Sequence, residues 1–300
     1  MFNILNSYTA QIVSLGTVLL GVVCGLIGTF AVLKKESLVG DTVSHAALPG
    51  ICFSYILTGE KELTILLIGA LISGLMAYML INFISKTTNI NFNNILALVL
   101  STFFGFGIVL ITYIQKLPGA NKAGLNKFIF GQSAAILKSD VYLIISVLLI
   151  VLIFLAIYWF KFKIIIFDKI YAETIYGEKV KYINFIMSFL IVICVVIGLE
   201  IVGVILMSSL LIVPAVSARQ WSNNFNIVTL LSMLIGGGAG FVGSAISSSD
   251  LNLPTGPVII LILSIVVFFS LIFSNKRGLL KKYIYKKNRQ KEIIKELTEL

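Results

Sequence analysis

Two ionisable side chains stand four residues apart in an otherwise apolar stretch of the sequence. Asp41 and His45 belong to the segment GDTVSHAALPG, and His45 is the only histidine in the chain. On a helix, residues i and i+4 lie on the same face, one turn apart. A carboxylate and an imidazole placed in this way can bind one divalent cation. The alternative is structural, with Asp41 or Ser44 capping the helix and His45 hydrogen-bonded to a backbone carbonyl.

Two ligands are too few for a tight metal site, so this pair suggests a second copy of the chain. A two-fold dimer would bring another Asp41 and another His45 to the symmetry axis, which gives two nitrogen ligands and two or more oxygen ligands. Such a set suits zinc, manganese or iron(II), and the general order of affinities does not choose among them. A closed four-ligand site holds its metal structurally, so we expect weaker binding of an ion that passes through.

Two prolines and a glycine are candidate gate or helix-break positions. Pro49 lacks an N–H, so the carbonyl of His45 loses its usual donor, and Pro49 with Gly50 predicts an interruption of the apolar run. Broken helices with freed carbonyls near the middle of the membrane are a recurring way to build cation sites. Pro214 is a further candidate break in a later run.

Glu200 is the other acidic residue associated with apolar runs, in the segment IGLEIVG. Ionisable residues inside membrane spans are costly, and each is therefore a candidate functional residue. Glu200 could attract a cation to an entrance or complete a second site, and it could equally be solvated at the membrane interface.

The composition is that of an integral membrane protein. Of 300 residues, 58% are apolar and 12% are charged, whereas soluble domains carry about 45–50% apolar and about 25% charged residues. A membrane-spanning helix needs about 20 mostly apolar residues. We therefore predict an all-α polytopic membrane protein with about eight or nine transmembrane helices, from nine apolar runs at 11–33, 41–58, 63–84, 91–115, 141–160, 184–200, 203–219, 226–249 and 255–274.

The formal net charge of +10 reflects membrane orientation and not a nucleic-acid partner. Nine of the 23 Lys and Arg residues lie beyond residue 275. If this tail and the loop 161–183 are cytoplasmic, 18 of the 23 fall on the cytoplasmic side, as the positive-inside rule requires. We expect residues 1–275 to form the membrane domain, with the N-terminus outside, and residues 276–300 to form a basic cytoplasmic tail that contacts anionic lipid.

The inward loop 161–183 contains a short helical pattern. The segment IYAETIYGEKV predicts an amphipathic helix that ends at Gly177. Such a helix could rest on lipid headgroups or dock a cytoplasmic partner, and the residues by themselves leave both open.

Sequence motifs argue against an ATPase or another enzyme. The chain has no GxxxxGK[ST] segment, and the GxGxxG pattern at 238–243 lies in an apolar run with no preceding strand. A single histidine supplies no hydrolytic triad. A stand-alone cation carrier or channel that uses the Asp41–His45 pair is one alternative, and a membrane-embedded enzyme is another, although it would need a catalytic set that the sequence does not supply.

The segment GDTVSHAALPG resembles the permease family of metal-ion ABC importers, which take up zinc, manganese or iron(II) in prokaryotic cells. The likeness extends through STFFGFGIVL, LNKFIFGQ, FDKIYAETIYGEKV, LEIVGVILMSSLLIVPAVSAR and LNLPTGPVIILI, so it covers nearly the whole chain. It implies a fold similar to the cobalamin and siderophore permeases. It also implies a homodimer with two cytoplasmic ATPase subunits and an extracytoplasmic metal-binding protein, in the plasma membrane.

The resemblance also implies roles for particular residues. In the family, the Asp and His of the motif line the metal path at the dimer axis, and here these are Asp41 and His45. In the family, the inward loop docks on the ATPase. The resemblance therefore implies a docking role for the corresponding residues of this chain, which are Asp168, Tyr171, Ala172, Ile175, Gly177 and Glu178. One departure is that Asn93 and Asn94 stand where the family often has a charged or acidic residue.

Overall fold

A computed structural model describes residues 8–59, 62–116, 138–248, 253–274, 276–283, 285–286 and 289–290, and these are helical with no strand. The principal helices are α1 (Tyr8–Leu33), α2 (Ser37–Thr58), α3 (Leu63–Thr87), α4 (Phe92–Lys116), α6 (Lys138–Phe167), α7 (Lys169–Tyr176), α8 (Lys179–Val202), α9 (Val204–Trp221), α10 (Phe225–Ser247) and α11 (Thr255–Phe273). The nine predicted apolar runs each coincide with one of the long helices, which confirms the predicted all-α class.

Seven of the described helices are long and apolar enough to cross a membrane: α1, α3, α4, α6, α8, α10 and α11. The other two long helices, α2 and α9, are less apolar and have 22 and 18 residues. At a rise of 1.5 Å per residue their lengths are about 33 and 27 Å, close to the thickness of the hydrocarbon core.

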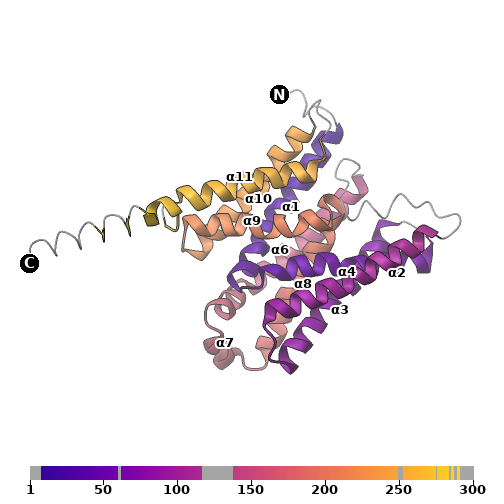
Figure 1. The fold of residues 1–300 in the computed structure, drawn as a ribbon, viewed down its shortest axis with the longest axis horizontal. Helices are drawn as coiled ribbons and strands as arrows, with labels where there is room; N and C mark the ends of the chain where they lie inside the picture. Colours follow the sequence, from indigo (N-terminus) through magenta and orange to yellow (C-terminus); the bar gives the residue numbers. More distant parts are fainter. Residues whose placement is uncertain are drawn as a thin grey trace, which may run out of the picture.

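The long helices form two groups, which meet directly where α2 packs against α9 and which α8 also joins. Helices α2, α3 and α4 pack against one another, and α1, α9, α10 and α11 form the second group. Helix α8 contacts α2 and α3 of the first group and α1 and α9 of the second, and α6 packs against α1 and α8. Figure 1 shows α7 at one end of this assembly, beyond the ends of α6 and α8.

Close backbone contacts between small residues hold α1 against α10. A Cβ atom built on Gly236 would collide with the carbonyl of Gly21, and one on Gly25 would collide with the backbone of Ser232. The hydroxyl of Ser232 donates to the carbonyl of Gly25 at 2.7 Å. Lipid gives helices no hydrophobic reason to associate, so small residues and interhelical hydrogen bonds provide the attraction between them.

The predicted helix breaks at Pro49, Gly50 and Pro214 are wrong, and the predicted role of these residues as a gate stays a prediction. Helix α2 continues through Pro49 and Gly50, and α9 continues through Pro214. In α2 the reason is the neighbouring helix α3. Gly50 lies against the backbone of Gly69, and the Ser73 hydroxyl donates to the carbonyl of Ala46 at 2.5 Å. Neighbouring helices and hydroxyl side chains commonly support proline-containing membrane helices in this way.

The chain does break between α8 and α9, where a single residue separates the two helices. Gly203 has φ 86° and ψ 166°, a conformation that is essentially restricted to glycine. The two runs that the sequence places almost end to end are therefore separate helices joined by a sharp turn.

We predict that Gly236→Ala destabilises the protein, whereas Gly238→Ala does not. The new methyl group at position 236 would meet the Gly21 backbone, while one at 238 has no atom within 4 Å. Overpacking of this kind costs about 1–3 kcal/mol. Thermal unfolding of the two purified variants in detergent measures the difference, and equal midpoints would show that the α1–α10 contact is not tight.

Candidate functional site

Asp41 and His45 lie one helical turn apart on α2, as the sequence predicts. The Nε2 atom of His45 is 3.7 Å from Oδ1 of Asp41, and the side chains are 18% and 32% exposed. This distance is longer than a hydrogen bond. The two groups therefore face the same region of space without being bonded directly to each other.

Most of α2 around the pair is buried, so Asp41 and His45 interrupt a packed surface. Positions 42–44 and 46–52 of the helix are buried. The Nδ1 atom of His45 is itself buried and has no hydrogen-bond partner among the described residues. The imidazole thus keeps hydrogen-bonding or ligand-binding capacity that the described part of the chain does not use.

An aromatic ring of α4 packs edge to face against the imidazole of His45. The ring of Phe104 lies 4.8 Å from that of His45, with an angle of 82° between the planes. Three residues further along α4, Gly107 gives the side chain of Leu48 room to pack against the helix backbone. Sequence reasoning missed Phe104, because only the packing of α4 on α2 reveals this contact.

The described chain supplies two possible metal ligands at this place and not a complete set. Among the residues that the structure describes, no group of three or more His, Cys, Asp and Glu side chains could hold a metal ion. Glu200 lies in the last turn of α8, and its side chain is outside the described residues. Its predicted role stays a prediction.

The docking residues predicted from the sequence gather on and around α7. Asp168 precedes the helix, and its carboxylate accepts a hydrogen bond from the backbone N–H of Tyr171 at 2.9 Å. Gly177 ends the helix with φ 53°. Glu178 follows and pairs with Lys181 at 2.6 Å. The short amphipathic helix predicted to end at Gly177 is confirmed.

The sides of α7 differ in exposure. Ala172 is completely buried against the rest of the protein, whereas the apolar and aromatic side chains of Ile170, Tyr171 and Ile175 are 79%, 53% and 51% exposed. The helix therefore presents apolar groups outward at one end of the bundle. A partner protein or a lipid surface could cover them.

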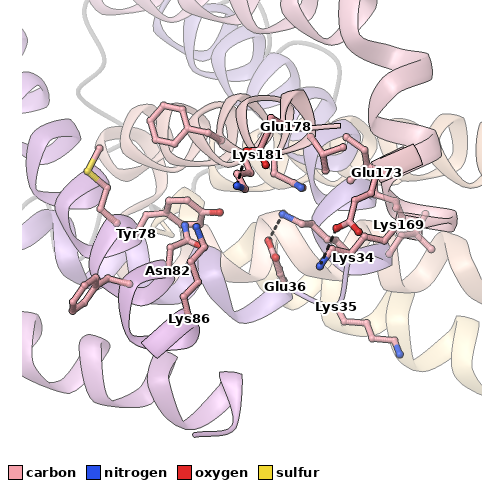
Figure 2. A pocket seen from close by; sticks show the side chains of 18 of the residues that line it. Lys34, Lys35, Glu36, Tyr78, Asn82, Lys86, Lys169, Glu173, Glu178 and Lys181 are labelled. Atoms are coloured by element: carbon pink, nitrogen blue, oxygen red, sulfur yellow. Dashed lines mark hydrogen bonds and ion pairs between the residues drawn. The ribbon is translucent and has the colours of Figure 1, made fainter. Parts of the chain in front are cut away.

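A cavity of about 1250 Å³ lies beside α7, between the first turn of α8, the end of α3 and the turn that links α1 to α2. Its wall carries ion pairs of Lys34 with Glu36 at 2.9 Å and of Lys169 with Glu173 at 3.8 Å (Figure 2). The sequence does not predict this cavity, because its walls come from segments that are far apart in the chain.

Comparison with known proteins identifies the family. Residues 6–274 match the ABC 3 transport family. The chain belongs to this family. It is 44% identical over 93% of its length to the zinc transport system membrane protein TroC of Treponema pallidum, of which it covers 94%. It is 38% identical over 91% of its length to the manganese transport system membrane protein MntC of Bacillus subtilis, and covers 63% of that longer protein.

Solved structures of related proteins have the same fold. PsaBC of Streptococcus pneumoniae, solved in complex with Fab, aligns with a TM-score of 0.81 at 27% identity, covering 94% of this chain and 98% of the other. An inward-facing structure described as a metal-chelate type ABC transporter aligns with a TM-score of 0.62 at 19% identity, over 87% of this chain and 83% of the other.

Membership of the ABC 3 transport family confirms several of the predictions from the sequence. The chain is a membrane-embedded permease subunit of an ABC transport system, and it carries no ATP site of its own. Its fold is shared with PsaBC and with the inward-facing transporter described above.

We predict that Asp168→Ala loosens α7 and that Asp168→Asn does not. Alanine removes the acceptor for the Tyr171 N–H, whereas asparagine retains one. Loss of such a cap costs about 1 kcal/mol, which corresponds to about fivefold faster amide exchange if the helix opens locally. Hydrogen exchange of the peptide covering α7 measures this, and unchanged exchange in the alanine variant would contradict the capping role.

Proposed function

We propose that this chain is the permease subunit of an importer that moves Mn²⁺, Zn²⁺ or Fe²⁺ into the cytoplasm. The observation that carries the proposal is the Asp41–His45 pair, which is partly exposed on a helix within a membrane domain. Ionisable groups at such positions mark substrate and ion pathways. The names of the relatives support a divalent metal, since TroC belongs to a zinc transport system and MntC to a manganese transport system.

Two copies of the chain complete the metal path in this proposal. One chain offers a carboxylate and an imidazole, and a second copy related by two-fold symmetry doubles the set. Nitrogen and oxygen ligands together suit all three candidate ions. The ion is a substrate that binds transiently and leaves, so no permanently bound cofactor is expected.

Transport proceeds by alternating access. An extracytoplasmic metal-binding protein delivers the ion to the outer mouth, and Asp41 and His45 of both copies hold it briefly. Cytoplasmic ATPase subunits then bind and hydrolyse ATP, and their movement opens the path inward. This proposal requires the C-terminus to be cytoplasmic, which the positive-inside distribution of Lys and Arg supports.

Helix α7 is the docking element for the ATPase. The exposed Ile170, Tyr171 and Ile175 side chains provide an apolar contact surface, and the cap at Asp168 stabilises the helix that presents them. An amphipathic helix laid in a groove is a common mode of recognition between proteins. The competing occupant is the lipid headgroup layer.

We predict that His45→Ala and Asp41→Asn each reduce metal uptake at least tenfold. The transported ion would lose a ligand from each of the two copies, while the fold keeps its packing. Uptake of Mn²⁺ and Zn²⁺ by cells that also contain the ATPase and the binding protein measures the effect. Leu57→Ala is the control, because Leu57 is 83% exposed on the same helix and lies three turns from His45.

Normal uptake by a well-assembled His45→Ala variant would overturn the proposed function. Uptake by the chain without any ATPase would instead favour a stand-alone carrier or channel. Competition among Mn²⁺, Zn²⁺ and Fe²⁺ in the same assay identifies the ion.

We predict that Tyr171→Ala weakens copurification of the ATPase, whereas Tyr142→Ala does not. Both tyrosines are exposed, but Tyr142 lies near the start of α6, at the opposite end of that helix from α7. Truncation of an aromatic anchor in an interface commonly costs more than 1 kcal/mol. Equal recovery of the ATPase with both variants would argue that α7 rests on lipid.

A further inference from the structure

The cavity beside α7 carries an excess of positive charge. Five lysines and three glutamates line it, which gives a net charge of +2. Each glutamate forms an ion pair with a lysine on its own segment, and these lysines are Lys34, Lys169 and Lys181. Lys35 and Lys86 make no ion pair among the described residues. The local pairs therefore leave the cavity as a whole attractive to an anion.

Two helices contribute polar side chains to this cavity at matching levels. Tyr78, Asn82 and Lys86 follow one another at intervals of four residues, so they lie on one face of α3 (Figure 2). At the inner end, the buried hydroxyl of Ser188 in α8 donates to the hydroxyl of Tyr78. Along their helices, Lys86 lies about 12 Å from Tyr78 and Lys181 lies about 10 Å from Ser188. Both lysines are exposed, so they mark the outer end.

An amide between these two levels has an unused acceptor. Asn184 lines the cavity four residues before Ser188 on α8. Its Oδ1 atom is buried and has no hydrogen-bond partner among the described residues. A buried acceptor without a donor is costly. A ligand that carries both a negative charge and a hydroxyl group would satisfy the lysines and this amide together.

The same cavity also has an apolar wall. Met79 and Phe83 of α3 and Phe185 of α8 line it, and they are 52%, 65% and 41% exposed. A free phosphate ester gains nothing from such side chains, whereas a phospholipid brings an apolar part with its charged headgroup. Basic pockets between membrane helices on the cytoplasmic side are known to bind anionic headgroups. The positive-inside distribution of Lys and Arg places this end of the bundle on that side.

We propose that this cavity binds the headgroup of an anionic phospholipid from the cytoplasmic leaflet. Lys86 and Lys181 hold the phosphate diester, a headgroup hydroxyl donates to Oδ1 of Asn184, and the apolar wall contacts the start of the acyl chains. Phosphatidylglycerol has this combination of charge and hydroxyl groups. The inference goes beyond metal import and shares with the proposed function only the cytoplasmic placement of this end.

The test counts the lipids that stay on the full chain in native mass spectrometry. The protein in a neutral detergent receives phosphatidylglycerol or phosphatidylcholine at equal concentration. We expect one phosphatidylglycerol per chain, retained at least five times more than phosphatidylcholine. The double variant Lys86→Gln and Lys181→Gln should lose this preference at least fivefold. The matched control is Lys276→Gln with Lys282→Gln, because both lysines are exposed and lie outside the cavity.

Four outcomes would overturn the proposed lipid site. Equal retention of the two lipids would remove the role of charge, and equal loss in the control variant would assign the lipid to the basic surface in general. Displacement by glycerol 3-phosphate at the same concentration would identify a soluble phosphate ester instead. A complex with the ATPase that retains no phosphatidylglycerol would assign the cavity to the ATPase. None of these outcomes bears on metal uptake, so the proposed function is tested separately.

The variant Asn184→Leu tests the hydroxyl contact separately. Leucine has a similar shape but no acceptor, so retention of phosphatidylglycerol should fall at least threefold. Retention of phosphatidylmethanol, which has the same charge and no headgroup hydroxyl, should not change. The midpoint of thermal unfolding without lipid should not fall, because the replaced Oδ1 atom has no partner. The same effect on both lipids, or no effect on either, would overturn the contact with Asn184.

Discussion

A carboxylate and an imidazole inside a membrane domain impose the strongest constraint on this structure. Each is costly to expose to hydrocarbon, yet both have to stay accessible if they are to meet an ion. The structure meets both demands by burying nearly all of α2 between Thr42 and Cys52, while Asp41 and His45 keep partial exposure. The Phe104 ring packs against the imidazole ring and makes no hydrogen bond to its nitrogen atoms.

The packing around α2 follows from that constraint. Without a hydrophobic force between helices in lipid, α2 needs close contacts to keep its position. Gly50 and Gly69 let α2 and α3 approach at backbone distance, and the Ser73 hydroxyl bonds the carbonyl of Ala46. The same chemistry holds α1 to α10 through Gly21 and Gly236. Small residues thus allow these helix pairs to approach at backbone distance, in addition to the large apolar side chains that fill the core elsewhere.

The proposed docking helix is connected to the proposed metal ligands through few elements. Helix α7 is followed by α8 after only Gly177 and Glu178, and α8 packs against α2. The turn with Lys34 and Glu36 lines the same cavity as α7 (Figure 2). This turn leads directly into α2, and Glu36 stands five residues before Asp41. A displacement of α7 therefore has a short route to the pair, by packing and along the chain.

Local interactions explain which features could be predicted from the sequence. Apolar runs indicate spans because about 20 residues must satisfy their own backbone hydrogen bonds in lipid. The spacing of Asp41 and His45 places them on one face because helical geometry repeats every 3.6 residues. The capped helix that ends at Gly177 is likewise set by neighbours along the chain. None of these features depends on contacts between distant segments.

Only the tertiary structure decided the features that depend on such contacts. Pro49 suggests a break from local chemistry, but α3 supports α2 at that point and the helix continues. Phe104 lies next to His45, 59 positions away in the chain, because α4 packs along α2. The sequence by itself determined the helices and the polar groups they carry. The tertiary structure decided which groups from different helices meet, because no pattern along the sequence indicates side-chain contacts across the bundle.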